Sequence, residues 1–183
     1  MRSLYSVLVL FSIALSSCER VDDINSVAEP PRYGLQGDYR LLDPSENPGT
    51  PVSSAVEVRS GESGTLTIGD YSLSIPAGSV RKTTTFRMTV TGNAVELTAV
   101  ENNGRSVTQF PNGLQLTMPY GQFNNISDPS ALVLAYVVPN GEGGFQFVEA
   151  FDASPNSANQ TVTGTIYHFS IYTLAKEIIV GID

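Results

Sequence analysis

Residues 64–76 read Gly-Thr-Leu-Thr-Ile-Gly-Asp-Tyr-Ser-Leu-Ser-Ile-Pro, the clearest hairpin pattern in the chain. Apolar and polar residues alternate on both sides of Gly69-Asp70, the spacing of strands that bury one face. Gly69 and Asp70 tolerate the positive φ angles of a tight turn. Pro76 has no N–H to donate, so the second strand is expected to end before it. This stretch predicts an antiparallel hairpin.

The same short alternating pattern continues toward the C-terminus, and no long segment carries apolar residues at helical spacing. The sequence therefore predicts an all-β fold, an antiparallel β-sandwich. Turns are expected at Asn102-Asn103-Gly104 and, as a tight hairpin, at Phe110-Pro111-Asn112-Gly113, and Pro119 should end a strand. The expected strands are Ala55–Arg59, Thr65–Ile68, Tyr71–Ile75, Thr84–Val90, Ala94–Val100, Ser106–Phe110, Leu114–Met118, Leu132–Val138, Phe145–Phe151, Thr161–Ile166 and Ser170–Leu174.

The N-terminus has the layout of a secretory signal. Arg2 precedes an apolar run from Tyr5 to Leu15, and small residues lead to Cys18, the single cysteine. A transmembrane helix is the alternative, but the run is shorter than the roughly 20 residues that cross a bilayer. Leu15-Ser16-Ser17-Cys18 resembles the lipobox, at which the thiol receives a diacylglyceryl group before cleavage. Residues 1–17 are thus expected to be a lipoprotein signal peptide, with Cys18 the lipidation site and the bilayer its partner.

Residues 18–54 are rich in Pro, Asp, Glu, Ser and Gly, a composition typical of an extended linker. Within it, 33–42 is the part that could dock onto the domain, which is expected over 55–183. The sequence leaves open whether 176–183 continue as a strand. A lipobox implies a bacterial cell envelope, and Glu19 after the cysteine fits the sorting rules of some bacteria for the outer membrane. Which membrane face the domain would occupy stays open.

Removing 17 of the 183 residues leaves 166, enough for one domain and a tail. A domain of this size buries enough surface to fold without a disulfide or metal, and no cofactor is expected. The formal net charge of the whole chain is −8. Because an acidic surface repels phosphates and no basic stripe is present, nucleic acid is not an expected partner.

Three segments, in order, resemble the ZU-five domain, a β-sandwich of ankyrins, zonula occludens proteins and netrin receptors. The resemblance spans about residues 56–175 and departs from the family at Gly61-Glu62-Ser63-Gly64, where a Gly-Gly pair is common. It implies a binding or scaffold module. The expected partner of a lipidated chain in the envelope is an unidentified envelope protein or polysaccharide. The segments are residues 64–80, the stretch Phe110-Pro111-Asn112-Gly113-Leu114-Gln115-Leu116-Thr117-Met118-Pro119-Tyr120, and His168-Phe169-Ser170-Ile171-Tyr172.

In some ZU-five domains a His-Phe-Ser of this kind is cut between Phe and Ser. The resemblance implies that Ser170 would attack the carbonyl carbon of Phe169 while His168 accepts its proton. The alternative is that the three are ordinary strand residues. Self-cleavage is therefore carried as an alternative function.

Other site chemistries have weaker support. A hydrolase would have to use His168, the only histidine, as its base, together with residues such as Asp152 and Ser154. The Gly-x-Ser-x-Gly motif that presents a nucleophilic serine in many hydrolases is not present. A calcium site at Asn124, Asn125 and Asp128 lacks ligand spacing, so turn formation is the better explanation. Carbohydrate binding is a further alternative, against which stand the absence of Trp and the core-like alternation of Tyr and Phe. The sequence thus favours a non-enzymatic module.

Overall fold

The computed structural model describes residues 38–42, 49–123 and 126–178. These residues form twelve strands and one short 3₁₀ turn, η1 (Pro129–Ala131), with no α-helix among them. The strands make two antiparallel sheets that pack against each other. The all-β sandwich expected from the sequence is confirmed.

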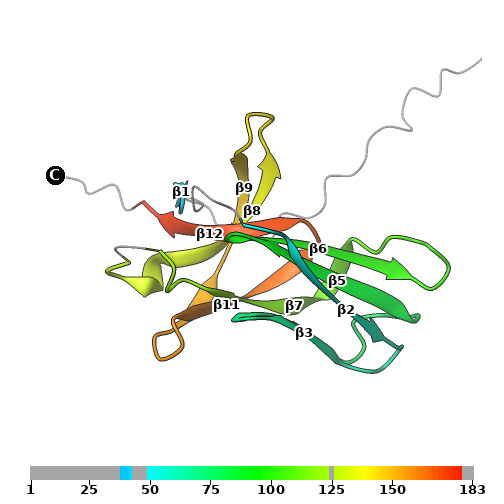
Figure 1. Ribbon diagram of the computed structural model, residues 1–183. Helices are drawn as coiled ribbons and strands as arrows, with labels where there is room; N and C mark the ends of the chain where they lie inside the picture. Colours follow the sequence, from blue (N-terminus) through cyan, green and yellow to red (C-terminus); the bar gives the residue numbers. More distant parts are fainter. Residues whose placement is uncertain (1–37, 43–48, 124–125, 179–183) are drawn as a thin grey trace, which may run out of the picture. The chain divides into compact units, whose positions relative to one another are not determined.

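Each sheet joins strands that lie far apart in the sequence (Figure 1). The larger sheet has the order β2 (Val52–Val58), β5 (Thr84–Thr91), β6 (Ala94–Glu101), β12 (Ile171–Glu177), β8 (Leu132–Pro139) and β9 (Phe145–Phe151), and β1 (Tyr39–Leu41) also pairs with β12. The smaller sheet has the order β10 (Ala153–Asn156), β11 (Thr161–His168), β7 (Gln109–Pro119), β4 (Tyr71–Ile75) and β3 (Gly64–Ile68). Every pairing is antiparallel.

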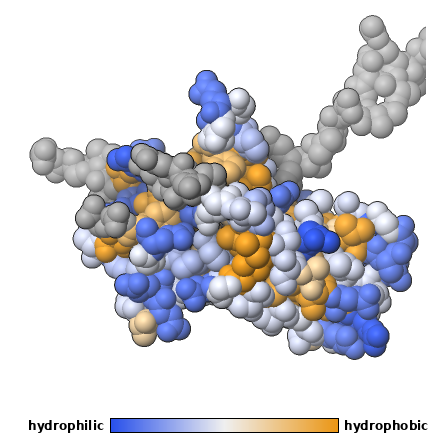
Figure 2. Space-filling model, in the orientation of Figure 1, coloured by the Kyte–Doolittle hydropathy of each residue, from blue (hydrophilic) through white to orange (hydrophobic). Residues whose placement is uncertain are grey.

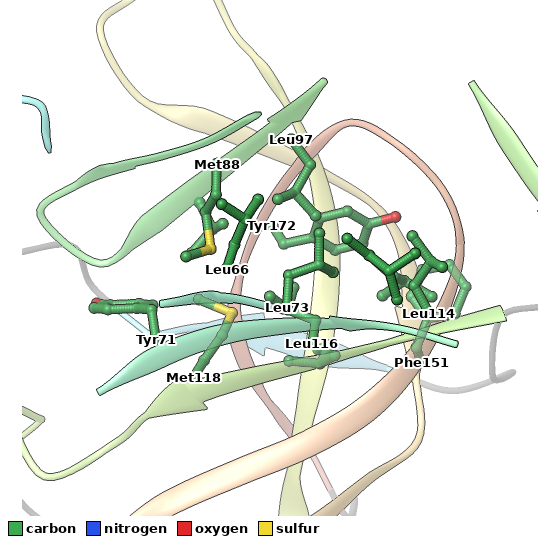
Figure 3. Close-up of a cluster of buried hydrophobic side chains, with 14 of the residues drawn as sticks. Leu66, Tyr71, Leu73, Met88, Leu97, Leu114, Leu116, Met118, Phe151 and Tyr172 are labelled. Atoms are coloured by element: carbon green, nitrogen blue, oxygen red, sulfur yellow. The ribbon is translucent and has the colours of Figure 1, made fainter. Parts of the chain in front are cut away.

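The core lies between the sheets and is built from alternate residues of each strand. Leu73 and Leu116 of the smaller sheet and Met88 and Tyr172 of the larger one have no exposed surface. Figure 3 shows these side chains pointing toward one another between the strands. This interdigitation is what two sheets packed face to face require. On the face of the molecular surface that Figure 2 shows, apolar patches are bordered by hydrophilic residues.

The hairpin at residues 68–71 is confirmed, because Ile68 pairs with Tyr71 across Gly69-Asp70. The φ angle of Gly69 is +55°, which an L side chain rarely adopts. Strand β4 ends at Ile75, before Pro76, and Pro119 is the last residue of β7. The turn at 102–104 is confirmed as well, with the Gly104 N–H donating to the Glu101 carbonyl at 2.9 Å.

The tight hairpin expected at Phe110-Pro111-Asn112-Gly113 is wrong. These residues lie inside the single strand β7, which runs from Gln109 to Pro119. Opposite them β11 shifts register, so that Ile166 pairs with Leu114 but His168 pairs with Gln109. Residues 110–113 of β7 thus lie opposite the single residue Tyr167, an excess larger than that of a one-residue β-bulge. Gly113 within this irregularity has φ +69°, a conformation that hairpin turns use as well.

Part of the expected linker belongs to the sandwich. Within 33–42, Tyr39–Leu41 forms β1 and pairs with Ala175–Glu177 of β12, and the Tyr39 ring stacks on Phe147 at 5.5 Å. Strand β2 begins at Val52, three residues before the expected boundary. Strand β12 continues to Glu177, and residues 179–183 lie outside the described part of the chain.

Candidate functional site

The expected self-cleavage triplet lies where the chain crosses from one sheet to the other. His168 ends β11 of the smaller sheet, and Phe169 and Ser170 connect it to β12 of the larger sheet. The Phe169 N–H donates to the Thr108 carbonyl, and the Leu97 N–H donates to the Ser170 carbonyl, both at 3.0 Å. The main chain is thus hydrogen-bonded on both sides of the bond in question.

A β-bulge in β9 sets the direction of an acidic side chain that the sequence analysis did not single out. Tyr136 pairs with Glu149, but the next residue of β8, Val137, pairs with Phe147, which leaves Val148 as the extra residue. Val148 is exposed, whereas only 13% of the Glu149 side-chain surface is exposed. Bulges often re-aim side chains next to functional sites. His168 likewise follows an irregularity, the one opposite Gly113.

These two irregularities bring Glu149 and His168 together. The Nε2 of His168 lies 3.3 Å from Oε2 of Glu149, and 12% of the His168 side chain is exposed. Its Nδ1 lies 3.3 Å from the hydroxyl oxygen of Tyr172. The rings of Tyr136 and Phe151 flank the imidazole with centroids at 4.9 and 5.6 Å. We call Glu149, His168 and Tyr172 the histidine cluster.

The hydrogen-bond roles in the histidine cluster follow from the single proton of Tyr172. Its hydroxyl donates to the main-chain carbonyl of His168 at 2.5 Å. The Glu149 carboxylate can only accept, so the Nε2 atom of His168 donates to it. The Nδ1 atom faces the phenol oxygen of Tyr172. Burial, and after it the charge of Glu149, raises the pKa of Tyr172, so the phenol keeps its proton.

This arrangement ties strands β9, β11 and β12 together. The ring nitrogens of His168 contact Glu149 and Tyr172, and no hydrogen bond joins either of them to Ser170 in the described part of the chain. Among the described residues, the hydrogen bonds of the imidazole go to Glu149 and Tyr172 and not to Asp152 or Ser154. The Oε1 atom of Glu149 is buried without a hydrogen-bond partner in the same part of the chain.

The structure shows no candidate metal site in residues 38–42, 49–123 and 126–178, where no group of three or more His, Cys, Asp or Glu side chains is found. Of the calcium candidates, Asn124 and Asn125 lie outside these ranges. Asp128 caps η1 by accepting from the Ser130 N–H at 2.9 Å and the Ser130 hydroxyl at 2.6 Å. These bonds, the hydroxyl first, lower the pKa of Asp128. They are the contacts of a turn-forming aspartate.

Cys18, the expected lipidation site, lies outside the described residues. Comparison with known proteins found no matching family model, no matching curated protein and no matching solved structure. The ZU-five resemblance and the roles that it implies therefore stay predictions.

Proposed function

We propose that this chain is a lipid-anchored protein of a bacterial cell envelope, whose β-sandwich is a non-enzymatic binding or structural module. The observation that carries the proposal is Leu15-Ser16-Ser17-Cys18 at the end of a signal layout. Residues 19–37 separate Cys18 from the described sandwich, and a chain of that length reaches at most about 65 Å. The module would thus stay near the bilayer surface.

No helix in the described part of the chain is long and apolar enough to cross a bilayer. The contacts of the single histidine support the non-enzymatic part of the proposal, because its ring nitrogens lie against Glu149 of β9 and Tyr172 of β12 and so link these strands to β11.

Anchoring is tested by growing a bacterial host that expresses the full chain with a labelled fatty acid. Wild type is expected to incorporate the label and sediment with membranes, whereas Cys18→Ser should do neither because it lacks the thiol nucleophile. Ser17→Ala is the matched control, since it keeps a small residue before the cysteine and should be labelled normally. Equal labelling of wild type and Cys18→Ser would refute the anchor.

Self-cleavage at Phe169–Ser170 is a second candidate, favoured by the position of this bond at the crossover between the sheets. The Ser170 hydroxyl oxygen would bond to the Phe169 carbonyl carbon, and His168 would take the hydroxyl proton. The carbon–nitrogen bond would then break as the leaving amine takes a proton, and water would open the resulting ester. His168 would first have to give up its Nδ1 contact with Tyr172.

Mass spectrometry of denatured protein tests this second candidate. Cleavage would release residues 170–183, a piece of 14 residues, which β12 would hold in the native sandwich. Ser170→Ala should abolish the cut, Ser170→Cys should keep it because a thiol makes the same acyl shift, and His168→Ala should slow it. A full-length mass that persists through long incubation with hydroxylamine would eliminate this candidate.

A further inference from the structure

A pocket of about 540 Å³ opens at one end of the sandwich, remote in sequence from the histidine cluster. It is lined by residues from segments 50–52, 68–71, 90–92, 119–122 and 159–160, most of which are turns or strand ends. We call it the turn pocket. Figure 3 shows Tyr71 at one end of the core and Phe151, a neighbour of His168, toward the other. The volume of the turn pocket lies within the roughly 300–1,000 Å³ that is usual for small-ligand sites.

A hydrogen-bonded tyrosine organises the inner part of the turn pocket. The Tyr71 hydroxyl donates to the Gly92 carbonyl at 3.1 Å and accepts from Nε2 of Gln122 at 3.0 Å. Tyr71 itself is buried, whereas Gln122 is exposed. Two turns and the hydroxyl are thereby held in fixed positions, with the Gln122 carboxamide at the surface.

Gln160, another residue that lines the turn pocket, has an unusual backbone conformation. Gln160 has φ +52°, and no other non-glycine residue in the described ranges has a positive φ. Its carbonyl accepts from the Tyr120 N–H at 2.7 Å, and its side-chain Oε1 lies over Gly121, where any added Cβ would overlap it. The positive φ lies in the turn that joins β10 to β11, where Asn156 pairs with Thr161. In this conformation the Gln160 side chain lies over Gly121, the residue before Gln122.

The polar and charged side chains that line the turn pocket favour a neutral ligand that carries hydroxyl groups. Gln122, Asn159 and Gln160 carry carboxamides, which both donate and accept hydrogen bonds. The lining contains no Lys, Arg or His among the described residues, and its one acidic side chain is that of Asp70. With a chain net charge of −8, an anionic ligand would be repelled. Neutral hydroxyl groups match the carboxamides and the carboxylate.

Part of the remaining lining is apolar and suits the C–H faces of a sugar ring, and Thr50 adds a hydroxyl. Val52, Ile68, Val90 and Pro119 contribute aliphatic carbon to the walls. A site with aliphatic walls and a few fixed polar groups is the usual composition of a small-molecule pocket. Hydroxyl groups on the rim of a ring and C–H groups on its faces are what a saccharide offers.

We propose that the turn pocket binds a neutral saccharide unit of an envelope polysaccharide. The inference rests on the proposed function as a binding module and names its ligand class. Gln122 and Gln160 bond to sugar hydroxyls, the aliphatic residues contact the ring faces, and Asp70 accepts from a hydroxyl. Binding needs no stacking tryptophan, because the ring lies against aliphatic walls.

The test is calorimetric titration of the full chain, purified in detergent. The probes are maltohexaose, cellohexaose, mannohexaose and chitohexaose, with an acidic hexagalacturonate and a neutral Asn- and Ser-rich peptide beside them. At least one neutral oligosaccharide should bind at millimolar concentration and the acidic one should not. Gln122→Ala and Gln160→Ala should each weaken binding about 3- to 10-fold, the loss expected for one neutral hydrogen bond. Gln146→Ala, an exposed glutamine of β9, is the matched control and should bind like wild type.

Absence of binding by all four neutral oligosaccharides would overturn the inference, as would binding that the two variants leave unchanged. Binding of the peptide alone would assign the pocket to a protein partner instead. Each of these failures leaves the anchor test at Cys18 unaffected, so the two proposals fail separately.

Discussion

Phe86→Ala is expected to lower the free energy of unfolding by about 3–5 kcal/mol, the loss typical of a buried phenylalanine truncated in a well-packed core. Phe86 lies in β5 of the larger sheet and has no exposed surface. Its ring lies 5.6 Å from that of Phe110 in the smaller sheet and 5.7 Å from that of Phe169 in the crossover. The change therefore removes contacts that join both sheets and the crossover.

Urea unfolding followed by circular dichroism measures this loss. Phe147→Ala is the control, because Phe147 is only partly buried in the small cluster outside the main core. Its loss should be clearly smaller. Equal losses for the two variants would mean that the three phenylalanine rings do not join the sheets as described.

His168→Leu is expected to lower stability by about 3 kcal/mol, because it leaves the Glu149 carboxylate buried without a partner. Glu149→Leu should lower stability by a similar amount, since it leaves Nε2 of the His168 imidazole buried without its partner. The double variant His168→Leu/Glu149→Leu should recover most of the loss, as replacing both partners of a buried hydrogen bond by apolar groups often does. It also removes the unpartnered Oε1 atom.

The double-mutant cycle isolates the coupling between the two residues, measured again by urea unfolding. We expect the stability loss of the double variant to be much smaller than the sum of the losses of the two single variants. Tyr172→Phe provides a milder comparison, since it removes the hydroxyl that bonds to His168 while keeping the ring. If the two single losses simply add in the double variant, the Glu149–His168 pair contributes nothing to stability.

Much of the fold could be predicted because apolar alternation and turn residues record which face of a strand is buried. The hairpin at 68–71 shows this clearly, since Gly69 and the alternation on both sides agree. The segment 110–113 shows the limit. Asn112-Gly113 supplies a positive φ, which serves a hairpin or an irregularity within a strand equally well, and only pairing with β11 decides between them.

Strand β10 was missed for a related reason. It contains Pro155 and turn-forming neighbours, which argue against a strand, yet it lies at the edge of the smaller sheet where proline is tolerated. An edge position is a property of the assembled sheet and cannot be inferred from the residues of one segment.

The candidate site was only partly predictable. His168 stood out as the single histidine, but its partner Glu149 did not, because the sequence pattern of β9 does not show which residue is the extra one of a bulge. The one local signal is that alternation fails over residues 147–151, where Val148 and Ala150 add apolar residues beside the phenylalanines. The turn pocket could not be predicted either, since five separate segments meet there.

The central claim, a lipid-anchored chain with an intact sandwich, is tested most directly by the mass of the whole protein extracted from bacterial membranes. The account predicts one species that begins at Cys18, carries a diacylglyceryl group on Sγ and an acyl chain on the new amino group, and ends at Asp183. A species that begins at Met1 and carries no acyl mass would contradict it.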